Sequence, residues 1–273
     1  MKIVDKNRPL AAIVCGFTGG GTTMLTEVLR QHPRLDSAFE GGFLLTEEAS
    51  DFLTLEPYYS ALKKTWQVSD QQLARICSVD TWPAVYRRLR QNSPVIKNKN
   101  VLLFDKTPRY MTCLSQVLRK VPNVPCISLV RDPRAVFWTR IKRTFRKESP
   151  EMNIQEWAEA EFESGVKGYS THAEGLQQAL KSELKERILL VKYEELCLNP
   201  EVEARKIFNF LKLNSNADFL SFKGGKPRFR PCRDDGIKSS YISEYKKNLP
   251  SHICNAMAKS TDKYMDFHYN LGE

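Results

Sequence analysis

The chain has 273 residues, 41% of them hydrophobic and 27% charged, and it carries a formal net charge of +10 at pH 7. No apolar run approaches the ~20 residues of a membrane-spanning helix, residues 1–9 lack the apolar core of a signal peptide, and the seven cysteines form no C-x-x-C pair. We therefore exclude a membrane-spanning protein, a disulfide framework and a cysteine-based zinc site, and we expect a cytoplasmic protein with an anionic ligand.

The first predicted unit is a strand, a glycine-rich loop and a helix. Residues 11–15 are an unbroken apolar run of strand length, typical of a parallel strand buried on both faces. After the loop, apolar residues recur at helical spacing until His32-Pro33: Met24, Leu25, Val28 and Leu29. The loop glycines can turn successive N–H groups onto an anion at the positive end of the helix. This unit predicts a phosphate-binding loop, with an ordinary tight turn as the alternative.

The loop fits the P-loop template G-x-x-x-x-G-K-[ST] only in part. Residues 16–23 match it at the two outer glycines and at Thr23, but Thr22 stands where the template has lysine. Nucleotide kinases and ATPases use that lysine on the phosphates being cleaved. Its absence disfavours a phosphoryl-transfer enzyme such as a small-molecule kinase.

Residues 35–92 are predicted to contain a carboxylate turn followed by a helical insertion. Residues 35–39 are a candidate second strand that delivers Glu40-Gly41-Gly42 to an edge of the sheet or to the carboxyl end of the strand. Short helices are expected around 44–55, 58–66, 69–77 and 81–91. Because no linker-like stretch interrupts the chain, we expect these helices to be an insertion of about 44–92 in one domain that spans 1–273. Their aromatic residues either wall an acceptor pocket or pack in the core.

Two further strands each end beside a basic residue. The strand at 101–104 is followed by Lys106, and the strand at 126–130 is followed by Arg131. Open α/β sheets hold ligands at the carboxyl ends of their parallel strands, so both residues are candidate ligand contacts. Thr139 lies about two helical turns beyond Arg131 and can point to the same side. An arginine and a hydroxyl together suit a dianionic phosphate.

The remainder of the chain continues the alternation of helices and strands. We expect a long helix over 153–184, a strand over 187–192 that ends in Tyr193, a helix from Pro200, a basic loop over 224–236, and short helices around 239–248 and 251–259. The segment 131–147 holds seven Lys or Arg and one Asp. Such clusters often bind nucleic acid, but no nucleic-acid-binding motif accompanies this one. A small polyanion is therefore preferred to a specific nucleic acid.

Taken in series, four segments resemble the sulfotransferases that use 3′-phosphoadenosine 5′-phosphosulfate (PAPS). They are residues 16–23, 104–108, 129–139 and 191–200. The resemblance implies a P-loop-like, three-layer α/β/α fold with a central parallel sheet. It also implies metal-independent transfer of a sulfuryl group from PAPS to a hydroxyl or amine, with adenosine 3′,5′-bisphosphate as product. The acceptor would be a small molecule, a carbohydrate or a peptide.

The resemblance assigns roles residue by residue. The 5′-phosphosulfate would be held by Gly20, Gly21, Thr22 and Thr23, and the 3′-phosphate by Arg131 with Thr139. Tyr193 would lie near the nucleotide. Glu40 matches the carboxylate that acts as general base in the bacterial and protein-tyrosine branches of the family, and Lys106 matches a lysine that those relatives aim at the transferring group.

One loop position departs from the family pattern. Members usually carry Lys or Arg directly before the Ser/Gly-Gly-Thr of the loop, and this chain has Gly19 there. We expect Gly19 to bind the donor through its backbone amide, and Lys106 and the helix dipole to replace the missing cation. The sequence thus predicts an active sulfotransferase, with a non-catalytic nucleotide-binding relative as the alternative. Further along, Lys226, Arg228 and Lys238 are equivalent candidates for an additional contact to the 3′-phosphate.

Overall fold

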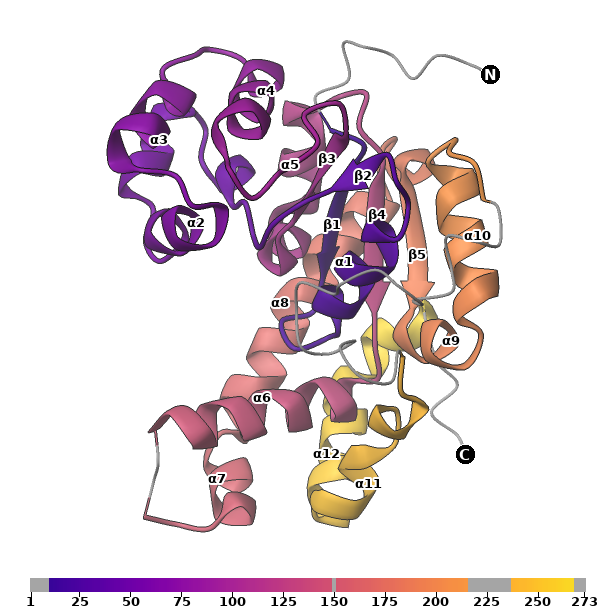
Figure 1. The fold of residues 1–273 in the computed structure, drawn as a ribbon. Helices are drawn as coiled ribbons and strands as arrows, with labels where there is room; N and C mark the ends of the chain where they lie inside the picture. The colour runs from indigo at the N-terminus through magenta and orange to yellow at the C-terminus, as the bar shows by residue number, and fades with distance from the viewer. Residues whose placement is uncertain (1–9, 149–150, 216–236, 268–273) are drawn as a thin grey trace.

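A computed structural model describes residues 10–148, 151–215 and 237–267 of the chain. Its centre is a five-stranded sheet with the order β2-β3-β1-β4-β5, in which all neighbouring strands run parallel (Figure 1). The strands are β1 (Ala12–Gly16), β2 (Leu35–Asp36), β3 (Leu102–Lys106), β4 (Cys126–Val130) and β5 (Ile188–Lys192). The central parallel sheet predicted from the sequence is confirmed.

The middle strand, β1, contributes to a hydrophobic core on each face of the sheet. All five of its residues are buried. Successive side chains of a strand point to opposite faces. Accordingly, Ile13 packs in one core and Val14 packs in the other. This explains why the sequence shows an unbroken apolar run here, and it places the end of β1 in the middle of the carboxyl edge of the sheet.

Helices cover both faces, so the predicted three-layer α/β/α fold is confirmed. One face is covered by α1 (Thr22–Arg30), α9 (Tyr193–Leu198) and α10 (Pro200–Phe210). The other face is covered by α5 (Leu114–Lys120) and α8 (Phe162–Leu180), with the 3-10 turn η3 (Pro108–Cys113) between β3 and α5 and a further turn, η4 (Lys185–Arg187), before β5.

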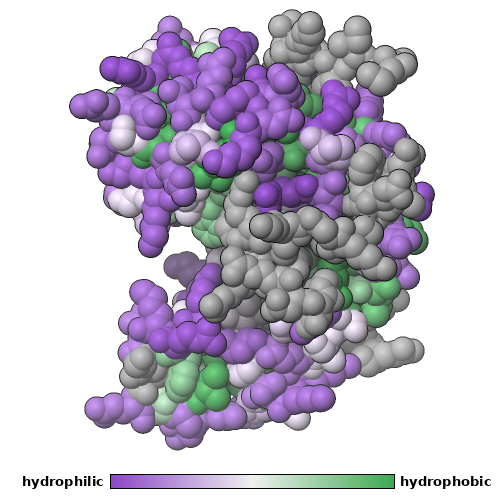
Figure 2. Space-filling model, viewed as in Figure 1, coloured by the Kyte–Doolittle hydropathy of each residue, from purple (hydrophilic) through white to green (hydrophobic). Residues whose placement is uncertain are grey.

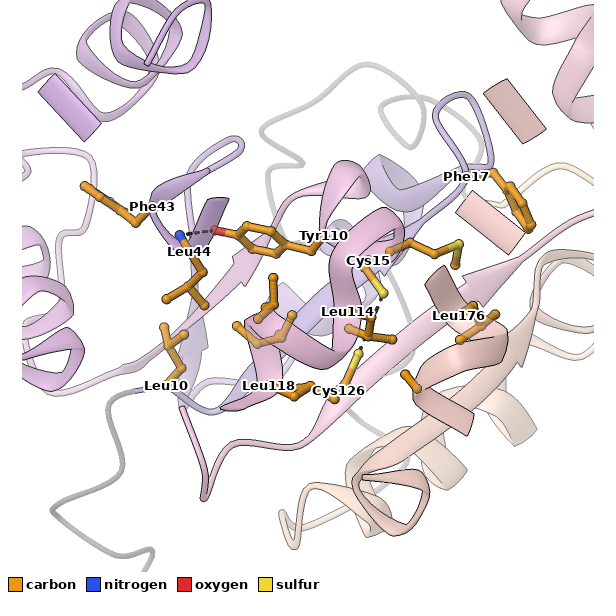
Figure 3. Close-up of a cluster of buried hydrophobic side chains, with 14 of the residues drawn as sticks. Leu10, Cys15, Phe17, Phe43, Leu44, Tyr110, Leu114, Leu118, Cys126 and Leu176 are labelled. Atoms are coloured by element: carbon orange, nitrogen blue, oxygen red, sulfur yellow. Dashed lines mark hydrogen bonds between the residues drawn. The ribbon is translucent and has the colours of Figure 1, made fainter. Parts of the chain in front are cut away.

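Cysteines serve as small side chains in these cores. Figure 3 shows the thiols of Cys15 and Cys126 facing each other near Leu114, with their sulfur atoms 3.7 Å apart. All six cysteines within the described ranges are free. Burial raises the pKa of the Cys77 thiol to about 12, so this thiol stays protonated at neutral pH.

A helical body, defined here as residues 43–92, lies beside the β3 side of the sheet (Figure 1). It contains η1 (Phe43–Leu45), η2 (Ser50–Thr54), α2 (Tyr58–Trp66), α3 (Asp70–Cys77) and α4 (Trp82–Asn92). The expected helix over 44–55 is wrong, because two 3-10 turns occupy that stretch. Thr46 adopts extended backbone angles between them, and its hydroxyl donates to the carbonyls of Phe43 and Glu48.

Two other expected elements also differ from the structure. The helix expected over 153–184 is divided into α7 (Ile154–Ala160) and α8, because Glu161 has a ψ of 3° and leaves the helical conformation between them. Strand β2 ends at Asp36 instead of residue 39. The Ser37 N–H donates to the Asp36 carboxylate over 2.8 Å, which turns the chain away after two paired residues.

The second half of the chain places a further group of helices beyond the carboxyl edge of the sheet (Figure 1). They are α6 (Pro133–Glu148), η7 (Ser239–Tyr241), α11 (Glu244–Asn248), α12 (Ser251–Thr261) and η8 (Asp262–Phe267), with α7 beside α6. The basic loop expected over 224–236 lies outside the described residues. Within the described part of the chain, no helix is both long and apolar enough to cross a membrane. Figure 2 shows a mainly hydrophilic surface over α2–α4 and α6–α7, with hydrophobic side chains in separated patches.

His32, just beyond the end of α1, makes the stability of the fold depend on pH. Its side chain is buried against Phe208, and its Nδ1 accepts the Arg34 N–H over 3.1 Å. Burial, and then the charge of Arg34, lower the pKa of His32 below 6.5. The unfolded chain therefore binds a proton below about pH 6.5 that the folded chain does not bind, and the free energy of unfolding should fall as the pH drops through that range.

Urea denaturation between about pH 7.5 and pH 5.5 measures this loss of stability. His32→Gln should reduce the slope relative to the unmodified chain. Part of the slope should persist in the His32 variant, because burial also lowers the pKa of His172. An unchanged slope in His32→Gln would contradict the assignment.

Candidate functional site

A cavity of about 360 Å³ lies at the carboxyl edge of the sheet. Six parts of the described chain line it: the loop between β1 and α1 with the start of α1, the turn at Phe39 and Glu40, Pro108, Arg131 with α6, Tyr193, and the segment from Lys238 to Glu244. The cavity therefore lies at the carboxyl ends of the parallel strands, where open α/β sheets bind their ligands.

The glycine loop supplies the wall beneath the start of α1. Gly19 and Gly21 have φ angles of +90° and +99°, a conformation that glycine adopts without strain. Gly21 is the N-cap residue of α1, and no side chain caps this helix end. Gly19, Gly21, Thr22 and Thr23 all line the cavity, so the positive end of α1 faces it. The Gly20 N–H instead donates to the Phe17 carbonyl over 2.7 Å, inside the loop.

The loop is held against the layer behind it by stacked aromatic rings. The ring of Phe17 lies 4.0 Å from that of Tyr169 in α8, with an angle of 3° between the planes. On the cavity side, a Cβ on Gly21 would lie 2.4 Å from the ring of Tyr193. Tyr193 thus packs directly on the loop backbone, and a larger residue than glycine cannot replace Gly21 without displacing it.

Arg131 and Thr139 come together as the sequence predicts. Arg131 Nη1 lies 3.5 Å from Thr139 Oγ1 and donates to the Gly19 carbonyl over 3.2 Å. The guanidinium lies 4.0 Å from the centre of the Tyr193 ring. Arg131 is thereby fixed by the glycine loop, by α6 and by Tyr193, and its charged end is presented at the cavity.

Glu40 and Lys106 form an ion pair at the opposite wall. Lys106 Nζ lies 3.1 Å from Glu40 Oε1 and 4.1 Å from the centre of the Phe39 ring. The Lys106 side chain is 1% exposed and the Glu40 side chain 22%. Burial lowers the pKa of Lys106, while the charges of Glu40 and Asp105 oppose that shift. Glu40 is one of the described residues that line the cavity. Lys106 is not one of them: it lies behind Glu40 and contacts the Glu40 carboxylate.

The C-terminal segment supplies contacts that the sequence did not reveal. The Tyr241 carbonyl accepts from Arg131 Nη2 over 2.8 Å, and Glu244 forms an ion pair of 2.7 Å with Lys142. Lys238 lines the cavity, while the other two candidates for an additional phosphate contact, Lys226 and Arg228, fall outside the described residues. Of the described residues that line the cavity, four are Lys or Arg and two are Glu, so its lining has a positive excess.

Asp105 is a buried carboxylate beside the site whose role the sequence did not reveal. It is 1% exposed and accepts hydrogen bonds from Tyr86, Tyr110, Thr107 and the backbone of Gly41. A carboxylate at the end of an apolar strand, next to Lys106, was the available signal in the sequence. Its partners could not be foreseen because Gly41 lies 64 residues away along the chain.

Comparison with known sequences finds related proteins over most of the chain. Residues 11–217 match the model of the Sulfotransferase family. The chain is 23% identical over 274 residues to the protein-tyrosine sulfotransferase of Drosophila melanogaster, an alignment that covers 94% of this chain and 51% of that protein. It is 30% identical over 129 residues to the nodulation protein NoeE of Sinorhizobium fredii, covering 47% and 30% of the two chains. The chain thus spans about half the length of the first of these relatives and less of the second.

Solved structures share the same fold. The sulfotransferase domain from the Synechococcus PCC 7002 olefin synthase superposes with a TM-score of 0.66 at 20% identity, covering 99% of this chain and 98% of that domain. Mouse sulfotransferase SULT7A1 superposes with a TM-score of 0.57 at 13% identity, covering 97% and 87%. At these identities the likeness concerns the fold alone.

Gly19 stands at the loop position where relatives usually carry Lys or Arg, and its backbone conformation disfavours a side chain there. A side chain here would have to adopt a φ of +90°, and its Cβ would lie 3.3 Å from Thr139 Cγ2. Gly19→Ala should therefore lower the free energy of unfolding by about 1–3 kcal/mol, and Gly19→Arg should carry the same strain. Chemical denaturation measures the change.

Gly168→Ala is the matched control, because it also adds one Cβ. Gly168 lies within α8, and its added Cβ would meet no atom within 4 Å. This substitution should raise the stability by about 0.5–1 kcal/mol through helix propensity. A Gly19→Ala variant as stable as the unmodified chain would show that the loop does not need the left-handed conformation.

Proposed function

Because this chain belongs to the sulfotransferase family, we propose that it transfers a sulfuryl group from PAPS to a hydroxyl or amine acceptor and releases adenosine 3′,5′-bisphosphate. The observation that carries the proposal is the meeting of Arg131 and Thr139 with the glycine loop at one cavity. The guanidinium of an arginine can bind one anion, and the N-terminus of a neighbouring helix can bind a second. Such a pair suits a nucleotide that carries charged groups on both its 5′ and its 3′ positions. The solved mouse sulfotransferase of similar fold is complexed with PAP, which supports the same ligand class here.

The donor contacts follow from the lining of the cavity. Gly19, Gly21, Thr22 and Thr23 would hold the 5′-phosphosulfate with backbone amides and hydroxyls at the positive end of α1, while the Gly20 amide stays bonded to Phe17 within the loop. Arg131 and Thr139 would hold the 3′-phosphate, and Tyr193 would contact the nucleotide from its position on Gly21. This position of Tyr193 depends on Gly21, since a Cβ there would meet the Tyr193 ring.

Transfer requires a group that takes the proton of the acceptor and positive charge for the sulfuryl oxygens and the leaving phosphate. Glu40 would be the general base, because its carboxylate lines the cavity while Lys106 holds Oε1. Lys106 would supply charge from behind Glu40, and the N-terminus of α1 would supply it from the loop. In this scheme the charge compensation comes from the protein and the transfer is metal-independent.

The acceptor would approach from the side of the helical body (43–92). Tyr58 of α2 lies against Gly42, where a Cβ would be 2.6 Å from the tyrosine ring, so the body closely borders the turn that carries Glu40. We assign this body to the wall of the acceptor pocket, as an insertion within a single domain over 1–273. A small molecule, a carbohydrate or a peptide remains an acceptor class to be tested, and the protein-tyrosine sulfotransferase relative favours including tyrosyl peptides.

Gly19 favours one other function, namely nucleotide binding without catalysis. The loop keeps its amides but lacks the cation that relatives usually carry, and its backbone angle opposes a replacement. A small-molecule kinase is disfavoured by Thr22 at the position of the Walker lysine. Ligand choice separates the kinase, which would bind ATP with magnesium, from the other two candidates, which would bind the bisphosphate. Turnover of PAPS separates the active sulfotransferase from the non-catalytic nucleotide-binding protein.

The assignment of Arg131 gives the sharpest binding test. Arg131→Ala should weaken the binding of adenosine 3′,5′-bisphosphate by about 2–4 kcal/mol, because the 3′-phosphate loses a charged hydrogen-bond partner. Adenosine 5′-phosphate, which lacks the 3′-phosphate, should bind to both forms almost equally. Isothermal calorimetry of the two ligands measures the difference.

Thr139→Ala is the companion variant and should act in the same direction with a smaller effect, because it removes one neutral hydroxyl. Titration of ATP with and without magnesium on the unmodified chain completes the series. Equal losses for the two adenosine ligands would remove Arg131 from the 3′-phosphate site. Tighter binding of magnesium ATP than of the bisphosphate would support the kinase instead.

A further inference from the structure

We infer that Asp105 and Thr107 are positioning residues that hold the Glu40–Gly42 turn, and with it the general base, in its working geometry. The inference rests on the proposed function for the role of Glu40. The hydrogen bonds by which Asp105, at the end of β3, and Thr107, just after it, hold the distant Glu40–Gly42 turn do not depend on that function.

Two consecutive backbone amides after Glu40 are bound by these side chains. The Gly41 N–H donates to Asp105 Oδ1 over 3.2 Å, and the Gly42 N–H donates to Thr107 Oγ1 over 3.0 Å. The Thr107 hydroxyl in turn donates to Asp105 Oδ1 over 2.9 Å. The backbone that carries Glu40 is thereby attached at two successive points to one buried side-chain pair.

Asp105 is itself fixed from the opposite side. The Tyr86 hydroxyl of α4 donates to Asp105 Oδ2 over 2.5 Å, and the Tyr110 hydroxyl donates to the same oxygen over 2.7 Å. Burial raises the pKa of both tyrosines well above the ordinary value, so they remain donors. Burial also raises the pKa of Asp105, an effect that the four donated hydrogen bonds oppose. Four donors around one acceptor group define where its oxygens lie.

The turn is shaped to fit this pair. A Cβ on Gly41 would lie 2.4 Å from Asp105 Oδ2, so only glycine allows the carboxylate to approach the backbone. Gly42 has a φ of +75° and carries the ring of Tyr58 on its other side. Meanwhile Lys106, between the two positioning residues in sequence, binds the Glu40 carboxylate itself. Asp105 and Thr107 hold the backbone, and Lys106 holds the side chain.

Small displacements of a general base are costly, because proton transfer needs hydrogen-bond distance to the acceptor hydroxyl. Thr107→Val keeps the shape of the side chain and removes the hydroxyl. We expect it to lower kcat about 10-fold or more with less than about a twofold change in the affinity for adenosine 3′,5′-bisphosphate. Thr107→Ser keeps the hydroxyl and should restore most of the rate.

Tyr86→Phe is the comparison variant, since it removes one of the two tyrosine hydroxyls on Asp105 Oδ2, leaves Tyr110 on that oxygen, and removes no bond to the turn. It should lower the stability while changing kcat much less than Thr107→Val does. The decisive comparison is a double-mutant cycle with Glu40→Gln. If Thr107 acts through Glu40, Thr107→Val should cause little further loss of kcat in the Glu40→Gln background. Equal fold losses in both backgrounds would overturn the inference.

Amide hydrogen exchange gives a readout that needs no turnover. Gly41 and Gly42 amides should be protected in the unmodified chain, and Thr107→Val should accelerate the exchange of Gly42 while Thr107→Ser and Tyr86→Phe leave it slow. If the unmodified chain transfers no sulfate, the proposed function fails, and the exchange data alone decide whether the turn is held as described. Fast exchange of both amides in the unmodified chain would overturn the positioning role.

Discussion

Burial of β1 on both faces of the sheet is the constraint on which the site depends. Because every residue of this strand is buried, the chain can present polar groups only where the strand ends. There it turns within a few residues into α1, through Gly19 and Gly21 in left-handed conformations. Phe17 fixes the start of that turn by stacking on Tyr169. The packing that forms the two cores therefore also directs the positive end of α1 to the cavity.

A second constraint is the burial of opposite charges on consecutive residues of β3. Asp105 and Lys106 are each 1% exposed, and an unpaired buried charge would cost several kcal/mol. Each finds its partner on the same turn, Asp105 at the Gly41 amide and Lys106 at the Glu40 carboxylate. The charges assigned to the proposed transfer are thus also part of what holds the turn in place. Removal of the Glu40 carboxylate by truncation would leave Lys106 buried without its partner, whereas Glu40→Gln keeps an oxygen for it to bind.

The sequence predicts the features that arise from local patterns and from general rules of sheets. The apolar run of β1, the glycines after it and the spacing from Arg131 to Thr139 were sufficient to place the candidate site at the carboxyl edge of the sheet, where the cavity lies. The site residues Glu40 and Lys106 also come together, but the sequence could not show that Lys106 lies behind Glu40, because the burial of a side chain depends on the whole fold. The breaks at Thr46 and Glu161 were missed for a different reason, since each depends on a few local hydrogen bonds or angles within an otherwise helical composition.

Contacts between distant segments account for most of what the sequence did not reveal. The Tyr241 carbonyl and Arg131 are 110 residues apart, and Gly42 and Thr107 are 65 residues apart. A backbone carbonyl or amide carries no sequence signature, so such partners become visible only in the structure. The polar environment of Arg131 and the attachment of the Glu40 turn both belong to this class.

The most direct test of the account is turnover of sulfate-labelled PAPS with a panel of alcohols, phenols, tyrosyl peptides and amines, for the unmodified chain and for Glu40→Gln. We expect the unmodified chain to transfer sulfate to at least one acceptor class. We also expect kcat to fall by about 10² to 10⁴ in Glu40→Gln while adenosine 3′,5′-bisphosphate still binds, because the variant loses the proton acceptor and the charge that pairs with Lys106 but keeps the residues assigned to the donor. Tight binding of the donor without transfer to any acceptor, or equal turnover by the two forms, would contradict the account.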